Sequence, residues 1–199
     1  MKVVTRLVLA FSFMFTSLAN AEVILSIDPA TQSDTPGSTV SMMIRIDGLG
    51  DGVPQSLSSF DIDVEFDTSV LSFAGYNLFD DLGDISNVEA DDFSFGEYAA
   101  GVVNVSELSY LSTFDLWDFQ PGGFALAELL FTINPNATKT TTDVSFTYAS
   151  LLDGEGFLLN NFGGVRNASV SVPAPATVLM MGIALVALSF RKKSNKSGI

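Results

Sequence analysis

Hydrophobic and polar positions alternate with a period of two along most of residues 22–172, and helical periodicity is almost absent. The clearest case is the segment 60–67, where Phe, Ile, Val and Phe take the even positions and Asp, Asp, Glu and Asp the odd ones. Such a strand turns its apolar side chains to a core and its carboxylates to water. A shift of the pairing by one residue would bury four carboxylates, so the pattern also fixes the register.

The same reasoning predicts up to ten short strands. They are expected at residues 23–27, 40–46, 60–67, 70–76, 88–95, 102–110, 124–133, 144–148, 157–159 and 165–172. Gly, Asn, Asp and Pro gather in the gaps between them, as turns require. Because no segment has the pattern of a crossover helix, the sequence predicts an all-β protein with an antiparallel β-sandwich at residues 22–172.

The N-terminus has the pattern of a secretory signal peptide. Lys2 and Arg6 are followed by an apolar run at 7–15 and by Ala19 and Ala21, which form a small-residue cleavage site. We therefore expect residues 1–21 to be removed during export.

The C-terminus has the pattern of a membrane anchor. Residues 178–190 carry no charge, and a helix from 174 to 190 would be roughly 25 Å long, which is just short of the hydrocarbon core of a bilayer. We expect a transmembrane helix at about 176–190. Arg191, Lys192 and Lys193 follow at once, and a basic flank of this kind stays in the cytoplasm, so residues before 173 are expected on the outer side.

The tail at 173–199 resembles the PEP-CTERM sorting signal of Gram-negative bacteria. The resemblance rests on Val172, Pro173, Ala174 and Pro175, the apolar segment and the basic cluster 191–193, with Ala174 standing where the family has Glu. It implies processing by an exosortase-type enzyme near 173–175 and at least transient anchoring in the inner membrane. It also implies transfer to the cell surface or extracellular matrix, with a link to exopolysaccharide or biofilm.

A second resemblance concerns the domain itself. The run 59–73, with Glu65-Phe66-Asp67-Thr68-Ser69-Val70-Leu71 at its centre, is similar to the cohesin-like fold, and residues 127–133 resemble a late strand of that module. The resemblance implies a nine-stranded jelly-roll sandwich related to carbohydrate-binding modules. A dockerin-like protein partner is compatible with it, although nothing in the sequence selects one.

Composition narrows the range of functions. Residues 22–172 contain all 23 acidic residues and three basic ones, a net charge of about −20 that argues against nucleic acid as a partner. The chain has neither Cys nor His, so it lacks the usual nucleophile, catalytic base and zinc ligands. Many carboxylates are present, but no glycosidase pair can be selected among them. We therefore predict a protein that is not an enzyme.

Two groups of side chains are candidates for ligand binding. The first group is acidic and offers oxygen ligands for Ca²⁺. Its residues do not have the spacing of a calcium-binding loop, so we favour the interpretation of a solvated anionic face over that of a metal cofactor. Its members are Asp61, Asp63, Glu65, Asp80, Asp81 and Asp84. The second group is aromatic and could stack on sugar rings. It consists of Tyr110, Phe114, Trp117 and Phe119. A loop that caps the sandwich with its rings turned inward fits the same residues, and we favour that arrangement.

Together these features predict an exported surface or matrix protein with a non-catalytic binding or adhesive sandwich. A carbohydrate-binding module for polysaccharide is the alternative, and a calcium-stabilised structural protein is a third possibility.

Overall fold

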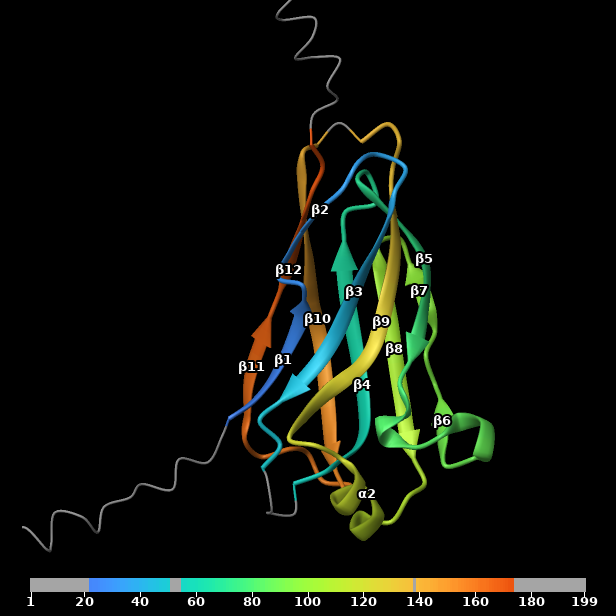
Figure 1. Cartoon of the computed structure of the whole chain (residues 1–199), viewed down its shortest axis with the longest axis vertical. Helices are drawn as coiled ribbons and strands as arrows, with labels where there is room; N and C mark the ends of the chain where they lie inside the picture. Colours follow the sequence, from blue (N-terminus) through green and yellow to red (C-terminus); the bar gives the residue numbers. More distant parts are fainter. Residues whose placement is uncertain (1–21, 51–54, 138, 174–199) are drawn as a thin grey trace, which may run out of the picture.

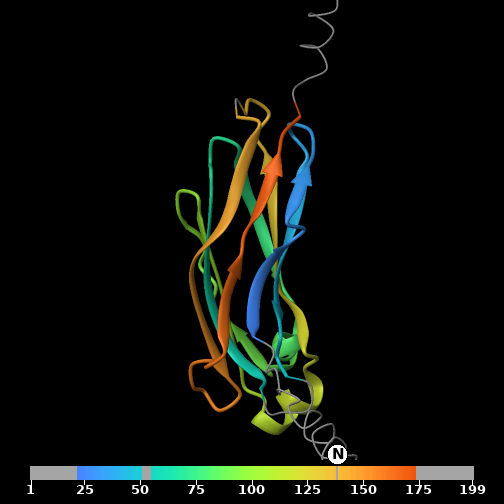
Figure 2. The ribbon, with the colours of Figure 1, turned by 90° about the vertical axis from the view of Figure 1, so that its left-hand side faces the viewer.

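Two β-sheets pack face to face in the computed structural model, which describes residues 22–50, 55–137 and 139–173 (Figures 1 and 2). The expected signal peptide with Ala19 and Ala21, the expected membrane helix at 176–190 and the tail residues Ala174, Pro175 and 191–193 lie outside the described residues. Among the helices of the described ranges, none combines the length and apolar character needed to cross a membrane.

The first sheet, sheet A, has five strands. Their spatial order is β11 (Phe162–Arg166), β1 (Val23–Asp28), β3 (Thr39–Asp47), β9 (Gly123–Ile133) and β5 (Leu71–Leu78). The second sheet, sheet B, is larger. Its order is β2 (Thr31–Ser33), β12 (Ala168–Ser171), β10 (Thr141–Asp153), β4 (Leu57–Phe66), β8 (Val102–Ser109) and β6 (Ala90–Asp92), and β7 (Gly96–Ala99) also pairs with β8.

Three short helical segments lie at one end of this sandwich or along its edge. They are the 3₁₀ turns η1 (Asp80–Leu82) and η2 (Ile85–Asn87) and the helix α2 (Thr113–Phe119). Figure 1 shows α2 at the end opposite to the one toward which β12 runs.

The predicted sandwich is confirmed, with several corrections to its strands. Residues 88–95 do not form one strand, because the chain leaves η2 with Val88 in the left-handed region and only 90–92 pair with β8. Residues 157–159 contribute one isolated bridge, between Leu152 and Leu158. Residues 165–172 divide into β11 and β12, which belong to different sheets. The pairs β1–β11 and β2–β12 are parallel, so the sandwich is mixed rather than purely antiparallel.

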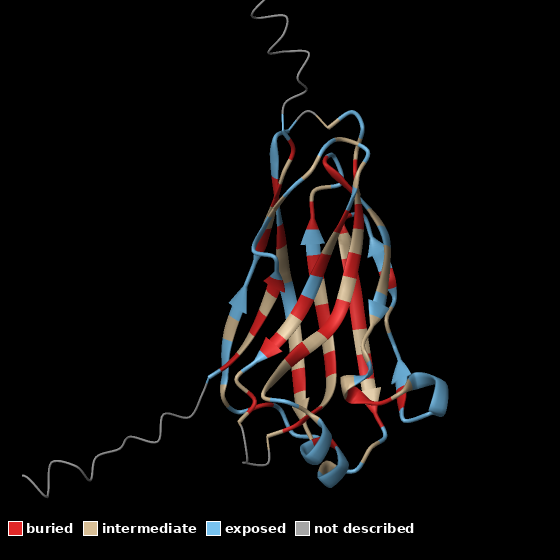
Figure 3. Ribbon diagram, viewed as in Figure 1, coloured by how far each residue is buried: buried red, intermediate tan, exposed pale blue. Residues whose placement is uncertain are grey.

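Alternation along the strands builds the core. In β4, Phe60, Ile62 and Val64 are completely buried, whereas Asp61 and Asp63 between them are half-buried. Figure 3 shows the alternation of buried and less buried positions along the strands. Phe131 of β9 meets Phe66 edge-on from the opposite sheet, with ring centroids 5.0 Å apart. All members of the buried core cluster lie between residues 23 and 172, so residues 22–173 contain both sheets and the whole core between them.

Asp67 closes the corner after β4. The Asp67 carboxylate accepts a hydrogen bond from the Ser69 backbone N–H at 2.8 Å, as expected for an acidic residue that closes a turn. Val70 and Leu71 return to the core and are fully buried.

Candidate functional site

A row of polar and aromatic side chains crosses the outer face of sheet B. Asp63 of β4 lies directly opposite Asn104 of β8 on one side and Tyr148 of β10 on the other. Residues directly opposite one another in an antiparallel ladder share a face, and Asp61 joins the row because it is two residues from Asp63. The acidic face predicted from the period of two therefore becomes the floor of a three-strand surface.

Asn104 organises this floor. Its side-chain amide donates hydrogen bonds to the carboxylates of both Asp61 and Asp63, at 2.7 and 2.9 Å. The side-chain oxygen of Asn104, Oδ1, accepts a hydrogen bond from the Phe95 backbone N–H at 3.3 Å. Because Asn104 is 5% exposed, these bonds hold two like-charged carboxylates side by side in a fixed geometry.

Three aromatic side chains stand around the floor and make it concave. We call this site the sheet B hollow; it encloses about 480 Å³ and is lined by Asp61, Asp63, Phe95, Tyr98, Asn104 and Tyr148. The rings are accessible, with Phe95 78%, Tyr98 55% and Tyr148 50% exposed. Apolar walls around a few oriented polar groups are typical of a binding surface.

Tyr98 is held over the floor by β7. Its hydroxyl donates to the Asp63 carboxylate at 3.0 Å, and this hydrogen bond to an anion raises the pKa of Tyr98 above its usual value. The turn between β7 and β8 depends on Gly101, which has a φ of +76° and whose added Cβ would lie 2.5 Å from the Phe66 carbonyl oxygen. The position of the ring is therefore set by a turn that only glycine fits.

The residues proposed for calcium do not converge. Asp61, Asp63 and Glu65 lie on β4, whereas Asp80 and Asp81 belong to η1 and Asp84 caps η2. The Asp84 carboxylate accepts a hydrogen bond from the Ser86 N–H at 2.7 Å, and its bonds to Ser86 lower its pKa. Within the described ranges no three such side chains are placed to hold a metal ion.

One buried acid was not singled out from the sequence. Glu107 of β8 points into the sandwich, is completely buried, and has no hydrogen-bond partner for either carboxylate oxygen among the described residues. Burial, followed by the charges of Asp92, Asp80 and Asp81, raises its pKa to about 8. Glu107 is therefore largely protonated in the folded domain at neutral pH.

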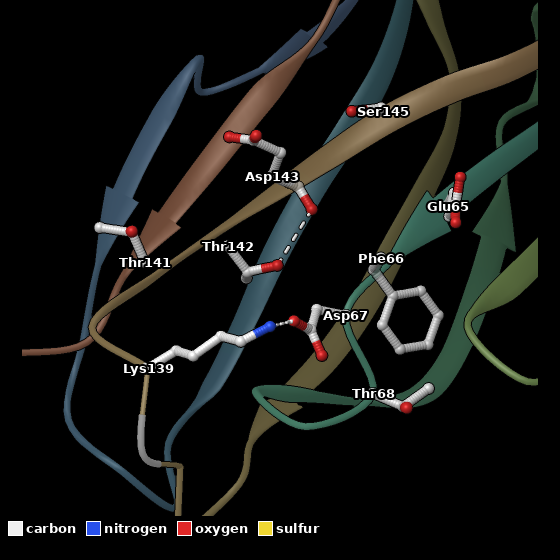
Figure 4. Close-up of a pocket in the computed structure, with 9 residues that line it drawn as sticks. All are labelled: Glu65, Phe66, Asp67, Thr68, Lys139, Thr141, Thr142, Asp143 and Ser145. Carbon is white, nitrogen blue, oxygen red and sulfur yellow. Dashed lines mark hydrogen bonds and ion pairs between the residues drawn. The ribbon is translucent and has the colours of Figure 1, made fainter.

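A further hollow of about 580 Å³ lies where β4 leaves and β10 enters sheet B (Figure 4). The Lys139 side chain reaches across it to an ion pair with the Asp67 carboxylate, and the Lys139 and Ser69 hydrogen bonds lower the pKa of Asp67 to about 2. Its one cationic side chain is already paired with Asp67, so we interpret this hollow as a structural corner rather than a ligand site.

The aromatic group at 110–119 is exposed, so the favoured prediction of an inward-facing cap is wrong. Leu116 is the buried residue of α2, while Phe114 is 76%, Trp117 40% and Phe119 56% exposed. Tyr110 stands apart, because it follows β8 and donates its hydroxyl to Asp91 at 2.9 Å. A shallow hollow of about 440 Å³ on α2 brings together Phe114, Asp115, Trp117 and Asp118.

Sequence reasoning missed Phe95, Tyr98, Asn104 and Tyr148. A signal existed for two of them, because the alternation in β8 and β10 assigns each position to an inner or an outer face. The alternation does not show which residues of neighbouring strands lie opposite one another, so the sequence could not predict that Asp63, Asn104 and Tyr148 share one face.

The comparisons with known proteins concern the tail and the fold. A model described as the PEP-CTERM protein-sorting motif matches residues 171–193. The chain carries a PEP-CTERM sorting motif. This motif indicates an exported protein that is sorted through a membrane-associated exosortase in a Gram-negative type of cell envelope. The comparison with curated proteins gives no match.

The sandwich is similar to solved cohesins. The sixth cohesin of scaffoldin B from Acetivibrio cellulolyticus, solved with a Cel5 dockerin, is 21% identical with a TM-score of 0.61, covering 76% of this chain and 99% of that one. CaCohA2 from Clostridium acetobutylicum is 21% identical with a TM-score of 0.59, covering 77% and 92%. A non-cellulosomal cohesin from the archaeon Archaeoglobus fulgidus is 9% identical with a TM-score of 0.54, covering 77% and 93%. At these identities the likeness establishes a cohesin-like fold.

Proposed function

We propose that this chain is an exported, exosortase-sorted binding protein whose sandwich captures a protein partner on the outer face of sheet B. The sheet B hollow is the observation that carries the proposal. Its rings are exposed, and its carboxylates are already positioned by Asn104 and Tyr98, so binding requires little new ordering of side chains. Aromatic side chains in a concave site are also the usual anchors of protein interfaces.

The lack of His and Cys and the fold agree with this role. The chain has no His or Cys to act as base or nucleophile. Its structural neighbours are cohesins, and the scaffoldin B cohesin was solved in a complex with a dockerin. A dockerin-like protein partner for the present chain is our inference from that likeness.

The sorting motif gives the proposed setting. After removal of residues 1–21 and processing near 173–175, the domain at 22–172 would be displayed at the cell surface or in the extracellular matrix. Association with exopolysaccharide or biofilm belongs to the same proposal. The net charge of about −20 over this segment keeps such a domain away from nucleic acids and other polyanions.

Photo-crosslinking in the native host tests the proposed surface. Tyr148 is replaced by a photoreactive phenylalanine analogue in the full chain, and Val165 of β11, which is 42% exposed and belongs to sheet A, receives the same analogue as the matched control. We expect a discrete protein adduct from position 148 and none of the same mass from position 165.

A second change separates the hollow from the general surface. Adding Tyr98→Ala to the chain that carries the analogue at 148 removes one wall and should abolish the adduct, while the circular dichroism spectrum of purified residues 22–173 stays that of a β-sandwich. An adduct that persists in this variant, or that forms equally from position 165, would remove the support for this face.

A further inference from the structure

The helix α2 presents a second surface that is separate from sheet B. Phe114 and Trp117 are three residues apart, as are Asp115 and Asp118, so each pair lies on neighbouring positions of the helix surface. These four side chains line the hollow of about 440 Å³, and we call them the α2 tip. Two accessible rings and two carboxylates therefore meet on α2. Figure 1 shows this helix at one end of the sandwich.

The rings are exposed although the helix itself is firmly held. Ser112 caps its N-terminus by accepting a hydrogen bond from the Asp115 N–H at 3.2 Å, and the Thr113 hydroxyl donates to the Gly154 carbonyl at 2.6 Å. At the other end, the Gln120 side chain bonds to both the N–H and the carbonyl of Leu57 at 2.7 Å. The surface is pre-organised, so a ligand would not have to order the backbone.

The charge at the tip defines the chemistry of an occupant. No Lys or Arg occurs between residues 46 and 138, and the described ion pairs join Arg45 to Asp47 and Lys139 to Asp67, so neither pair includes a residue of α2. Within the described part of the chain no ion pair therefore neutralises the two aspartates. They add to a domain that is already strongly acidic and repels anionic polymers. Aromatic faces attract both the apolar faces of sugar rings and cationic groups.

We propose that the α2 tip binds a cationic, amino-sugar polysaccharide. Sugar rings stack on Phe114 and Trp117, while Asp115 and Asp118 accept hydrogen bonds from hydroxyl and ammonium groups. The tip lies at the end opposite to the one toward which β12 runs (Figures 1 and 2). Because β12 ends at Ser171, where the matched sorting motif begins, a domain anchored through that motif turns the tip away from its attachment. This site is independent of the protein-binding face of sheet B.

Calorimetric titration of residues 22–173 tests the proposal with three soluble probes. The probes are a glucosamine hexamer, an N-acetylglucosamine hexamer and a cellulose-type glucose hexamer. We expect saturable binding of the glucosamine hexamer and at least about tenfold weaker binding of the two uncharged hexamers, because these lack the ammonium groups that the rings and carboxylates attract.

Variants distinguish a built site from general attraction to an acidic protein. Trp117→Ala and Phe114→Ala leave the net charge unchanged and should each weaken binding of the glucosamine hexamer by about tenfold or more. Phe157→Ala is the matched control, because Phe157 is 65% exposed and lies outside α2. Thermal melts show whether each variant is folded, and Phe114, which is 76% exposed, can be removed with little effect on packing.

Two results of these titrations would contradict the proposal for the α2 tip. Equal affinities for the parent domain and for both α2 variants would reduce the effect to polyelectrolyte attraction and overturn the proposal. Equal binding of the acetylated and the free hexamers would overturn its cationic specificity. Crosslinking at Tyr148 is unaffected by either result, so failure here and failure of the sheet B face can be told apart.

Discussion

Replacing Glu107 by Gln should stabilise the domain at and above neutral pH. The Glu107 carboxyl group is buried between the sheets without a hydrogen-bond partner among the described residues, and Asp92, Asp80 and Asp81 contribute further negative charge around it. The folded domain therefore favours the protonated acid, whereas the unfolded chain ionises it near its ordinary pKa of 4.5. Gln keeps the shape of the protonated acid and cannot ionise.

The sign and the size follow from the two pKa values. The contribution of Glu107 to stability is fully present below pH 4.5, declines as the unfolded chain loses its proton, and is lost as pH rises through about 8. Each pH unit in this window corresponds to about 1.4 kcal/mol. Relative to Glu107→Gln, the parent domain should thus lose on the order of 3 kcal/mol of unfolding free energy by pH 7 and on the order of 5 kcal/mol above pH 8.

Urea unfolding followed by circular dichroism at pH 5, 6, 7, 8 and 9 measures this difference. Glu65→Gln is the matched control, because Glu65 is exposed on the outer face of β4 and its replacement removes the same charge from the domain. We expect the free-energy difference between Glu107→Gln and the parent to widen with pH, and the difference for Glu65→Gln to stay small. Parallel pH profiles for Glu107→Gln and the parent would refute the burial argument.

Three further predictions concern hydrogen bonds in the sheet B hollow, at the Asp67 corner and at the end of α2. Asn104→Ala removes both bonds to the carboxylates of β4 and should lower the unfolding free energy by about 1–3 kcal/mol, measured by urea unfolding; an unchanged midpoint would contradict its organising role. Asp67→Asn should reduce the loss of unfolding free energy on acidification, because the Lys139 and Ser69 hydrogen bonds that lower the pKa of Asp67 to about 2 stabilise the fold above pH 3.8 and are lost as pH falls through 2. Urea unfolding at acid pH measures this loss, and the same loss in variant and parent would contradict the prediction. Gln120→Ala removes the hydrogen bonds that anchor the end of α2, so it should lower the unfolding free energy by about 2–3 kcal/mol and speed amide hydrogen exchange within the helix. Unchanged exchange would show that other contacts hold α2 in place.

The strands of the core could be predicted because each carries its own evidence. In β4 the alternation of Phe60, Ile62 and Val64 with acids allows one orientation, and the structure has that orientation. The short edge segments carry no such evidence. Three residues of β6 and three of the four residues of β7 pair with β8, and both strands owe their place to the edge of β8 rather than to a pattern of their own.

The sites were harder to predict than the sheets for a related reason. The sheet B hollow depends on which residues of β8 and β10 lie opposite Asp63, and a bulge between Phe146 and Tyr148 decides part of that register. Helix α2 has seven residues and buries one of them, Leu116, so it shows no apolar stripe. Its exposed rings violate the expectation that aromatics face inward, and such violations mark surfaces on which a partner or ligand can act.

Glu107 shows what a strand pattern can reveal and what it cannot. In β8 the residues Val103 and Val105 face the core, and the same parity places Glu107 and Ser109 there, so the sequence already indicates an acid on the buried face. It does not indicate whether a cation, a hydrogen bond or a proton neutralises that acid. In the structure Glu107 is buried, the charges of Asp92, Asp80 and Asp81 further raise its pKa, and its oxygens have no hydrogen-bond partner among the described residues. This leaves the proton as the means of neutralisation. The charge state of the core, and with it the stability of the sandwich, is therefore tied to the pH of the compartment into which the domain is exported.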